Sequence, residues 1–208
     1  MAFSTASSTS WLDRLRRRLL ACVLAFVLTF VLLPALAAEI DVANPQLTPG
    51  EDGYVLSADF RLELSPRLEE AVTKGVVLYF VAEFELTRER WFWLDEKLAS
   101  RSLTYRLSYH ALTRQYRLST GGLHQSFATL AEAVQVLARL RNWVAVERGD
   151  KLKTGEPYDA ALRLRLDINQ LPRPFQITAL GNKDWNLASD WKTWQVSLPP
   201  LPPPAEAK

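Results

Sequence analysis

The stretch GVVLYFVAEFELTRERWFW, residues Gly75–Trp93, decides the fold. Its apolar residues recur at every second position, so one face of an extended chain would carry Val76, Leu78, Phe80, Ala82, Phe84 and Leu86. The opposite face begins with apolar residues and ends with glutamates, among them Glu83 and Glu85. Period-two alternation of branched and aromatic side chains is typical of a β-strand. Burial on both faces at the start and on one face at the end predicts the long central strand of an antiparallel sheet.

Signals of the same kind predict strands before and after this segment. Two strands are predicted within Ile40–Leu64. Further strands are predicted at Leu103–His110, Gln115–Ser119, Leu123–Phe127, Trp143–Val146, Tyr158–Asn169 and Trp191–Leu198. Thr120-Gly121-Gly122 indicates a hairpin turn, and Asp95-Glu96-Lys97 is expected to turn the chain as well.

Two segments carry the start signals of helices. Ser65-Pro66 predicts an N-cap followed by proline at the first helical position, and Gly75 is expected to end that helix. The capping-box pattern Thr129-x-x-Glu132 predicts a helix over Leu130–Arg141. Phe175–Leu180 fits either a helical turn or a short strand. Seven or eight strands with two short-to-medium helices predict a mainly β protein, an antiparallel β-sandwich that is immunoglobulin-like in outline.

The first 37 residues have the layout of a secretory signal peptide. Arginines precede an apolar run, Leu19–Leu33, and the A-x-A motif Ala35-Leu36-Ala37 follows it. The run is shorter than the roughly 20 residues that a spanning helix needs. We therefore expect cleavage between Ala37 and Ala38, which leaves residues 38–198 as one β-rich domain and 199–208 as a Pro-rich disordered tail. The alternative is an uncleaved segment that anchors the same domain to the membrane.

Cleavage would change the charge of the protein. The whole chain has 25 basic and 23 acidic residues, of which residues 1–37 hold four Arg and one Asp. The expected mature chain is therefore close to neutral, and its composition does not indicate a nucleic-acid surface. Cys22 is the only cysteine and lies in the leader, so the mature domain has no disulfide, thiol nucleophile or thiolate metal site.

Candidate catalytic groups are few. Glu83 and Glu85 lie two residues apart on one strand face, and paired carboxyls at about 6–7 Å can hydrolyse glycosides. The simpler interpretation is a solvated face that is ion-paired across strands with Arg101 or Arg106. His110 and His124 are the only histidines and carry no metal-ligand spacing. We therefore assign no catalytic residue, no metal and no cofactor.

Tryptophans form the most distinctive pattern of the sequence. They gather in two short stretches, Trp91 and Trp93 in the first and Trp185, Trp191 and Trp194 in the second. Exposed, these rings would form a stacking platform for a glycan or a groove for a partner; buried, they would close the ends of the sandwich. We treat all five as candidate binding residues.

Several motifs resemble a known family. They are Tyr105-x-x-Ser-Tyr109-His110-x-Leu112-Thr113-x-Gln115-Tyr116, Leu166-Asp167 with Leu171-Pro172-x-Pro174, and Asp184-Trp185-x-Leu187-x-Ser189-x-Trp191. The chain is similar over most of residues 40–197 to the Gram-negative proline-rich signal peptide proteins, which carry a domain of unknown function. The resemblance implies an exported envelope protein without established catalytic residues. Proteins of this family are often encoded beside a membrane sensor kinase, which makes such a kinase a candidate signalling partner.

Three functions follow as expectations. The first is a periplasmic, non-catalytic binding or interaction module whose partner is an envelope protein and which contacts the membrane only through an uncleaved leader. The second is a glycan-acting enzyme that uses Glu83 or Glu85 beside the tryptophan platform. The third is a structural envelope protein with a Pro-rich tail as spacer or docking segment.

Overall fold

The computed structural model describes residues 40–88, 96–148, 152–153, 155–179 and 181–203, which all belong to one compact unit. The expected cleavage site at Ala37 and Ala38 and the candidate residues Trp91 and Trp93 lie outside the described residues. Within these ranges no helix is long and apolar enough to cross a membrane.

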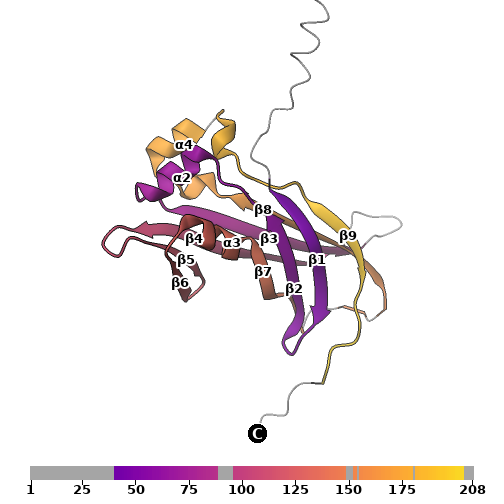
Figure 1. Cartoon of the computed structure of the whole chain (residues 1–208). Coiled ribbons are helices and arrows are strands. Elements are labelled where there is room, and N and C mark those ends of the chain that lie inside the picture. The colour runs from indigo at the N-terminus through magenta and orange to yellow at the C-terminus, as the bar shows by residue number, and fades with distance from the viewer. Residues whose placement is uncertain (1–39, 89–95, 149–151, 154, 180, 204–208) are drawn as a thin grey trace, which may run out of the picture. The chain divides into compact units, whose positions relative to one another are not determined.

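The described chain is mainly β and forms two antiparallel sheets. The small sheet has the order β1-β2-β7 and consists of β1 (Asp41–Pro49), β2 (Gly53–Arg61) and β7 (Arg139–Glu147). The large sheet has the order β6-β5-β4-β3-β8-β9 and consists of β3 (Leu78–Arg88), β4 (Glu96–His110), β5 (Gln115–Thr120), β6 (Leu123–Phe127), β8 (Pro157–Leu166) and β9 (Lys192–Ser197). Figure 1 shows the small sheet lying across one face of the large one. The predicted sandwich-like β architecture is confirmed.

Strand β3 is the central strand that the alternation predicts. It pairs with β4 on one side and with β8 on the other, so that Phe80 lies opposite Tyr105 and Leu166. Its inward residues Leu78, Phe80, Ala82, Phe84 and Leu86 are fully buried. The Phe84 ring lies edge-on to the ring of Trp143 in β7, with 6.5 Å between the centroids. The core therefore lies between the two sheets, and the opposite, outer face of the large sheet carries the polar residues of each strand.

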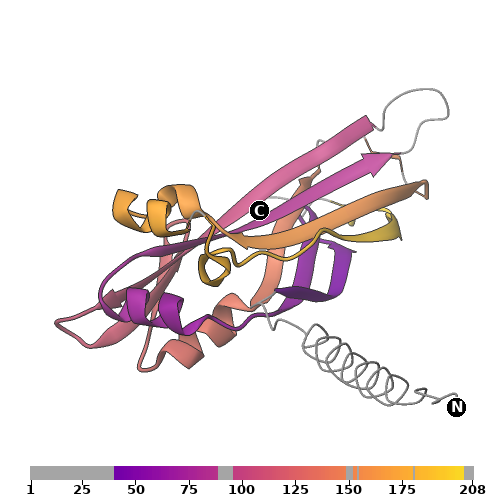
Figure 2. The same cartoon turned by 90° about the horizontal axis from the view of Figure 1, so that it is seen from above.

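The helices begin where the sequence predicts. Helix α2 (Pro66–Thr73) is capped by Ser65, whose hydroxyl accepts from the amide of Leu68 at 3.3 Å. Helix α3 (Leu130–Leu137) is capped by Thr129, which accepts from the amide of Glu132 at 3.2 Å. Figures 1 and 2 show α2 and α3 near each other, beside the large sheet.

Several predicted boundaries are wrong. Helix α3 ends at Leu137 rather than at Arg141, because β7 begins at Arg139 and Leu140 is buried opposite Ala58 of β2. Glu96 and Lys97 do not form a turn; they belong to β4 and pair with the end of β3.

The region after β8 also differs from the prediction. Strand β8 ends at Leu166, and Ile168–Gln170 forms a 3-10 turn (η1). The ambiguous segment is helical, as α4 (Arg173–Ala179), so the described residues contain three α-helices rather than two. A second 3-10 turn (η2, Lys183–Trp185) precedes β9.

Candidate functional site

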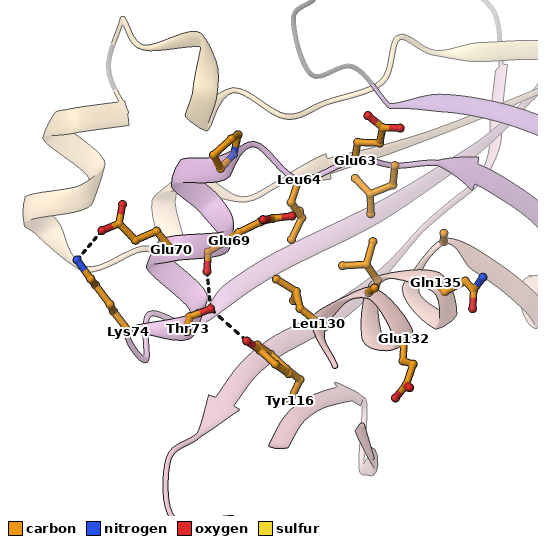
Figure 3. Close-up of a pocket in the computed structure, with 15 residues that line it drawn as sticks. Glu63, Leu64, Glu69, Glu70, Thr73, Lys74, Tyr116, Leu130, Glu132 and Gln135 are labelled. Carbon is orange, nitrogen blue, oxygen red and sulfur yellow. Dashed lines mark hydrogen bonds and ion pairs between the residues drawn. The ribbon is translucent and has the colours of Figure 1, made fainter. Parts of the chain in front are cut away.

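A large hollow on the described surface is a groove between α2 and α3. Its volume is about 1060 Å³, and Figure 3 shows it framed by both helices, by the connection between β2 and α2, and by β5. Small-molecule pockets span roughly 300–1,000 Å³ and enclose most of their ligand. This open groove lies at the upper end of that range, so it is also large enough for a segment of polypeptide.

The floor of the groove is apolar and only partly buried. It is formed by Leu64, Tyr116, Leu130, Val134 and Ala138, which pack against the core while remaining accessible from the groove. Figure 3 shows Leu64 and Leu130 in the space between the helices. Contiguous accessible apolar side chains on one surface are typical of an interaction site.

The rim of the groove is acidic. Glu63, Glu69, Glu70 and Glu132 line it together with one cation, Lys74. The Lys74 ammonium is 2.5 Å from a carboxylate oxygen of Glu70, and this hydrogen bond lowers the pKa of Glu70. The groove therefore carries a net charge of about −3 at neutral pH, counting four carboxylates and one ammonium.

Both walls of the groove are fixed by the fold. Leu68 and Val72 of α2 are fully buried, and the Ser65 hydroxyl donates to the carbonyl of Asp184 at 2.8 Å. The hydroxyls of Thr73 and Tyr116 are 3.1 Å apart, which links the end of α2 to β5. The groove is thus preformed by elements that are distant in sequence.

The structure assigns Glu83 and Glu85 to ion pairs. The Glu83 carboxylate accepts from Arg163 and, at 3.0 Å, from Arg165, both in β8; Glu85 pairs with Lys97 of β4 at 2.7 Å. Both glutamates form the expected cross-strand ion pairs, but the predicted partners, Arg101 and Arg106, are wrong. Burial raises the pKa of Glu83, yet the hydrogen bonds from Arg165 and Arg163 outweigh it and lower the pKa overall. A carboxyl held as an anion in this way is unsuited to the role of general acid.

The structure does not bring the second tryptophan cluster together on one surface. Trp185 is 4% exposed and packs on Phe175, with 5.5 Å between ring centroids. Trp194 is partly buried and contacts Phe84 on the inner face of the large sheet. Trp191 is exposed, and the guanidinium of Arg163 lies 4.5 Å from the centre of its ring on the outer face. Of these three residues, Trp191 is the most exposed, at 37%.

Both histidines lie at or near the surface. His110 ends β4, and its Nδ1 is 3.1 Å from the hydroxyl of Thr113. His124 lies in β6 and is exposed. In the part of the chain that the structure describes, no group of three or more His, Cys, Asp or Glu side chains could hold a metal ion.

Sequence reasoning missed the groove. Its acidic rim comes from glutamates that appear in the sequence as ordinary exposed positions, Glu63 before α2 and the others within the two helices, and its two walls are separated by more than fifty residues. One available signal was the amphipathic pattern of α3, which places Leu130 and Val134 on one face of the helix, and both side chains remain accessible from the groove.

The comparisons with known proteins give one finding. The model of the family described as "Domain of unknown function (DUF4390)" matches residues 37–195. No curated protein and no solved structure matches the chain.

Proposed function

Because the chain belongs to the DUF4390 family, whose domain has no assigned function, we propose a function from the groove: this protein is an exported, non-catalytic binding module of the cell envelope. The groove between α2 and α3 receives a basic, amphipathic segment of a protein partner. The leader-like residues 1–37 and the resemblance to the proline-rich signal peptide proteins support export to the periplasm.

The observation that carries this proposal is the combination of an apolar floor with an acidic rim. An amphipathic helix binds a groove by laying its apolar face on the floor. Its flanking lysines or arginines would then lie beside Glu63, Glu69 and Glu132. Complementary charge adds specificity and raises the association rate, whereas an acidic segment would be repelled.

The sensor kinase that the resemblance makes a candidate is a suitable partner under this proposal. The periplasmic part of this kinase would then have to contain a basic, amphipathic segment. The glycan-acting alternative has less support, because Glu83 is held as a carboxylate by Arg163 and Arg165.

The structural alternative rests on the Pro-rich tail. The Tyr54 hydroxyl donates to the carbonyl of Pro199 at 2.6 Å, and Arg148 donates to the carbonyl of Pro202 at 2.7 Å. The described part of the tail is therefore bound to its own domain. Because part of the tail is bound to its own domain, the tail spans a shorter distance than a free spacer of the same length.

A defined probe tests the groove in vitro. We expect a fluorescent model helix of leucine and lysine to bind the purified domain and a leucine–glutamate helix of equal length not to bind. Each rim charge contributes about 0.2–1 kcal/mol. Glu63→Lys/Glu69→Lys removes two attractions and adds two repulsions, so affinity should fall at least about fourfold. The control Glu51→Lys/Asp52→Lys makes the same charge change in the exposed turn between β1 and β2 and should bind as the wild type does.

The matching experiment in cells places a photocrosslinking residue at Ala131, an exposed position of the groove. A crosslink to one envelope protein should disappear in Glu63→Lys/Glu69→Lys and persist in Glu51→Lys/Asp52→Lys. Leu112, which is 92% exposed in the turn after β4, provides the control position. Equal binding of both model helices, or a crosslink that persists in Glu63→Lys/Glu69→Lys, would refute the proposal.

A further inference from the structure

A second hollow lies at the end of the β5–β6 hairpin, on the other face of the large sheet from the groove. Its volume is about 440 Å³, and its lining includes Arg106 of β4, Arg117 and Ser119 of β5, and His124 of β6. Side chains alternate between the faces of a sheet. Tyr116 and Leu118 of β5 point toward the groove and the core, so Arg117 and Ser119 point outward.

The strand register places Arg106 and Arg117 on the same face of neighbouring strands. Arg106 lies opposite Ser119, and Ser108 lies opposite Arg117, so the two arginines are diagonal neighbours on adjacent strands. Diagonal pairs have Cα atoms about 7–8 Å apart, within reach of long side chains. His124 lies opposite Ser119 on the next strand and extends the same row.

The cations of this hollow have no counter-charge in the described structure. The lining contains no carboxylate. The ion pairs of the described residues include neither Arg106 nor Arg117. The Nε of Arg117 is moreover buried without a hydrogen-bond acceptor. Like charges at this spacing repel each other, and an anion between them would relieve the repulsion and accept a hydrogen bond from the buried Nε of Arg117.

The remaining lining residues supply further donors and free space. Thr104 and Ser119 contribute hydroxyl groups. The turn Gly121-Gly122 closes one end, and a Cβ added at either glycine would meet no atom within 4 Å. A ligand can therefore approach the backbone of the turn closely.

We propose that this hollow is a binding site for a tetrahedral oxyanion of the phosphate class, held by Arg106 and Arg117 with the hydroxyls of Thr104 and Ser119. Guanidinium groups bind phosphate through paired hydrogen bonds that are stronger than those between neutral groups. The hollow is larger than one phosphate ion, so a phosphorylated headgroup at the membrane surface and a free phosphate fit the same chemistry. The site is independent of the groove between α2 and α3.

The experiment follows backbone amide NMR signals of the purified domain during a titration with inorganic phosphate, and in a second arm with phosphatidylglycerol vesicles. We expect the largest shifts at Ser119, Gly121 and Gly122, and the vesicle arm decides whether a headgroup can be the source of the oxyanion. Arg106→Gln should weaken binding about tenfold or more, the effect of losing a charged hydrogen-bond pair. The matched control Arg173→Gln, an exposed arginine at the start of α4, should leave binding unchanged.

Arg106 is exposed, so its replacement should not disturb folding, whereas Arg117→Gln is a second test at a half-buried position. Binding of either probe by the wild-type domain, together with weaker binding by Arg106→Gln, supports the site. The absence of shifts at the hairpin with both probes, or equal binding by Arg106→Gln and wild type, would overturn it.

Discussion

Replacing Glu83 with glutamine removes the charge at the centre of an ion-pair cluster on the outer face of the large sheet. In the folded protein the carboxylate accepts from Arg163 and from two nitrogens of Arg165, at 3.1 and 3.0 Å. Arg165 also approaches Asp167 at 3.4 Å. The Glu83 side chain is 21% exposed, and both arginines are about one-third exposed.

The expected cost follows from this partial exposure. Hydrogen bonds to charged groups contribute about 1.5–3 kcal/mol when buried, and exposed ion pairs contribute about 0.2–1 kcal/mol. Two pairs between these limits give about 1–2 kcal/mol for Glu83→Gln. For a domain of this size that loss lowers the melting temperature by about 2–8 °C. Glu63→Gln, at an exposed position of the groove rim, should change stability by less than about 0.5 kcal/mol.

The pH dependence of the stability difference tests whether the charge of Glu83 causes it. The pKa of Glu83 is lower in the folded protein than its ordinary value of 4.5, because the hydrogen bonds from Arg165 and Arg163 outweigh the effect of burial. A lowered pKa stabilises the fold above the unfolded value, and this stabilisation is lost as the pH falls through the folded value. The difference between wild type and Glu83→Gln should therefore be complete at pH 7 and shrink below about pH 4.5.

Urea unfolding followed by tryptophan fluorescence at several pH values measures this difference. Equal stability of the two proteins at pH 7 would contradict the assignment of Glu83 to a stabilising cluster. So would a difference of constant size down to the lowest pH at which both proteins fold.

Three further predictions concern stability. Trp185→Ala should cost about 3–5 kcal/mol because the residue is almost fully buried, whereas Trp191→Ala should cost about 1–2 kcal/mol because the residue is 37% exposed. Denaturant midpoints that do not separate the two variants would contradict the packing. Gly53→Ala should destabilise by more than about 1 kcal/mol, since φ is +144° and the new Cβ would lie 2.1 Å from the carbonyl of Val146; a wild-type melting curve would refute this. Burial raises the pKa of Tyr105 to about 12, so stability should fall as the pH rises from 10 to 12, and Tyr105→Phe should flatten that fall in alkaline unfolding curves; an unchanged slope would show that the phenol is accessible.

The local features of the fold could be predicted because each depends on neighbouring residues. The alternation in Gly75–Trp93 identified β3, and the caps at Ser65 and Thr129 identified the starts of α2 and α3. Each of these signals acts within a few residues, through side-chain direction or through a hydrogen bond to a nearby amide. The ends of the elements were less predictable. Helix α3 stops at Leu137 because β7 pairs with a strand about eighty residues earlier.

The sequence by itself therefore determined the type of most elements, the mainly β class and the leader-like composition of residues 1–37. Only the tertiary structure decided which charges neutralise Glu83, which tryptophan faces solvent, and where two helices leave an apolar floor between acidic side chains. The physical reason is the separation along the sequence over which each interaction acts. Alternation and capping operate between near neighbours in the chain, whereas ion pairing, ring burial and groove formation depend on segments that meet only when the two sheets close over their core.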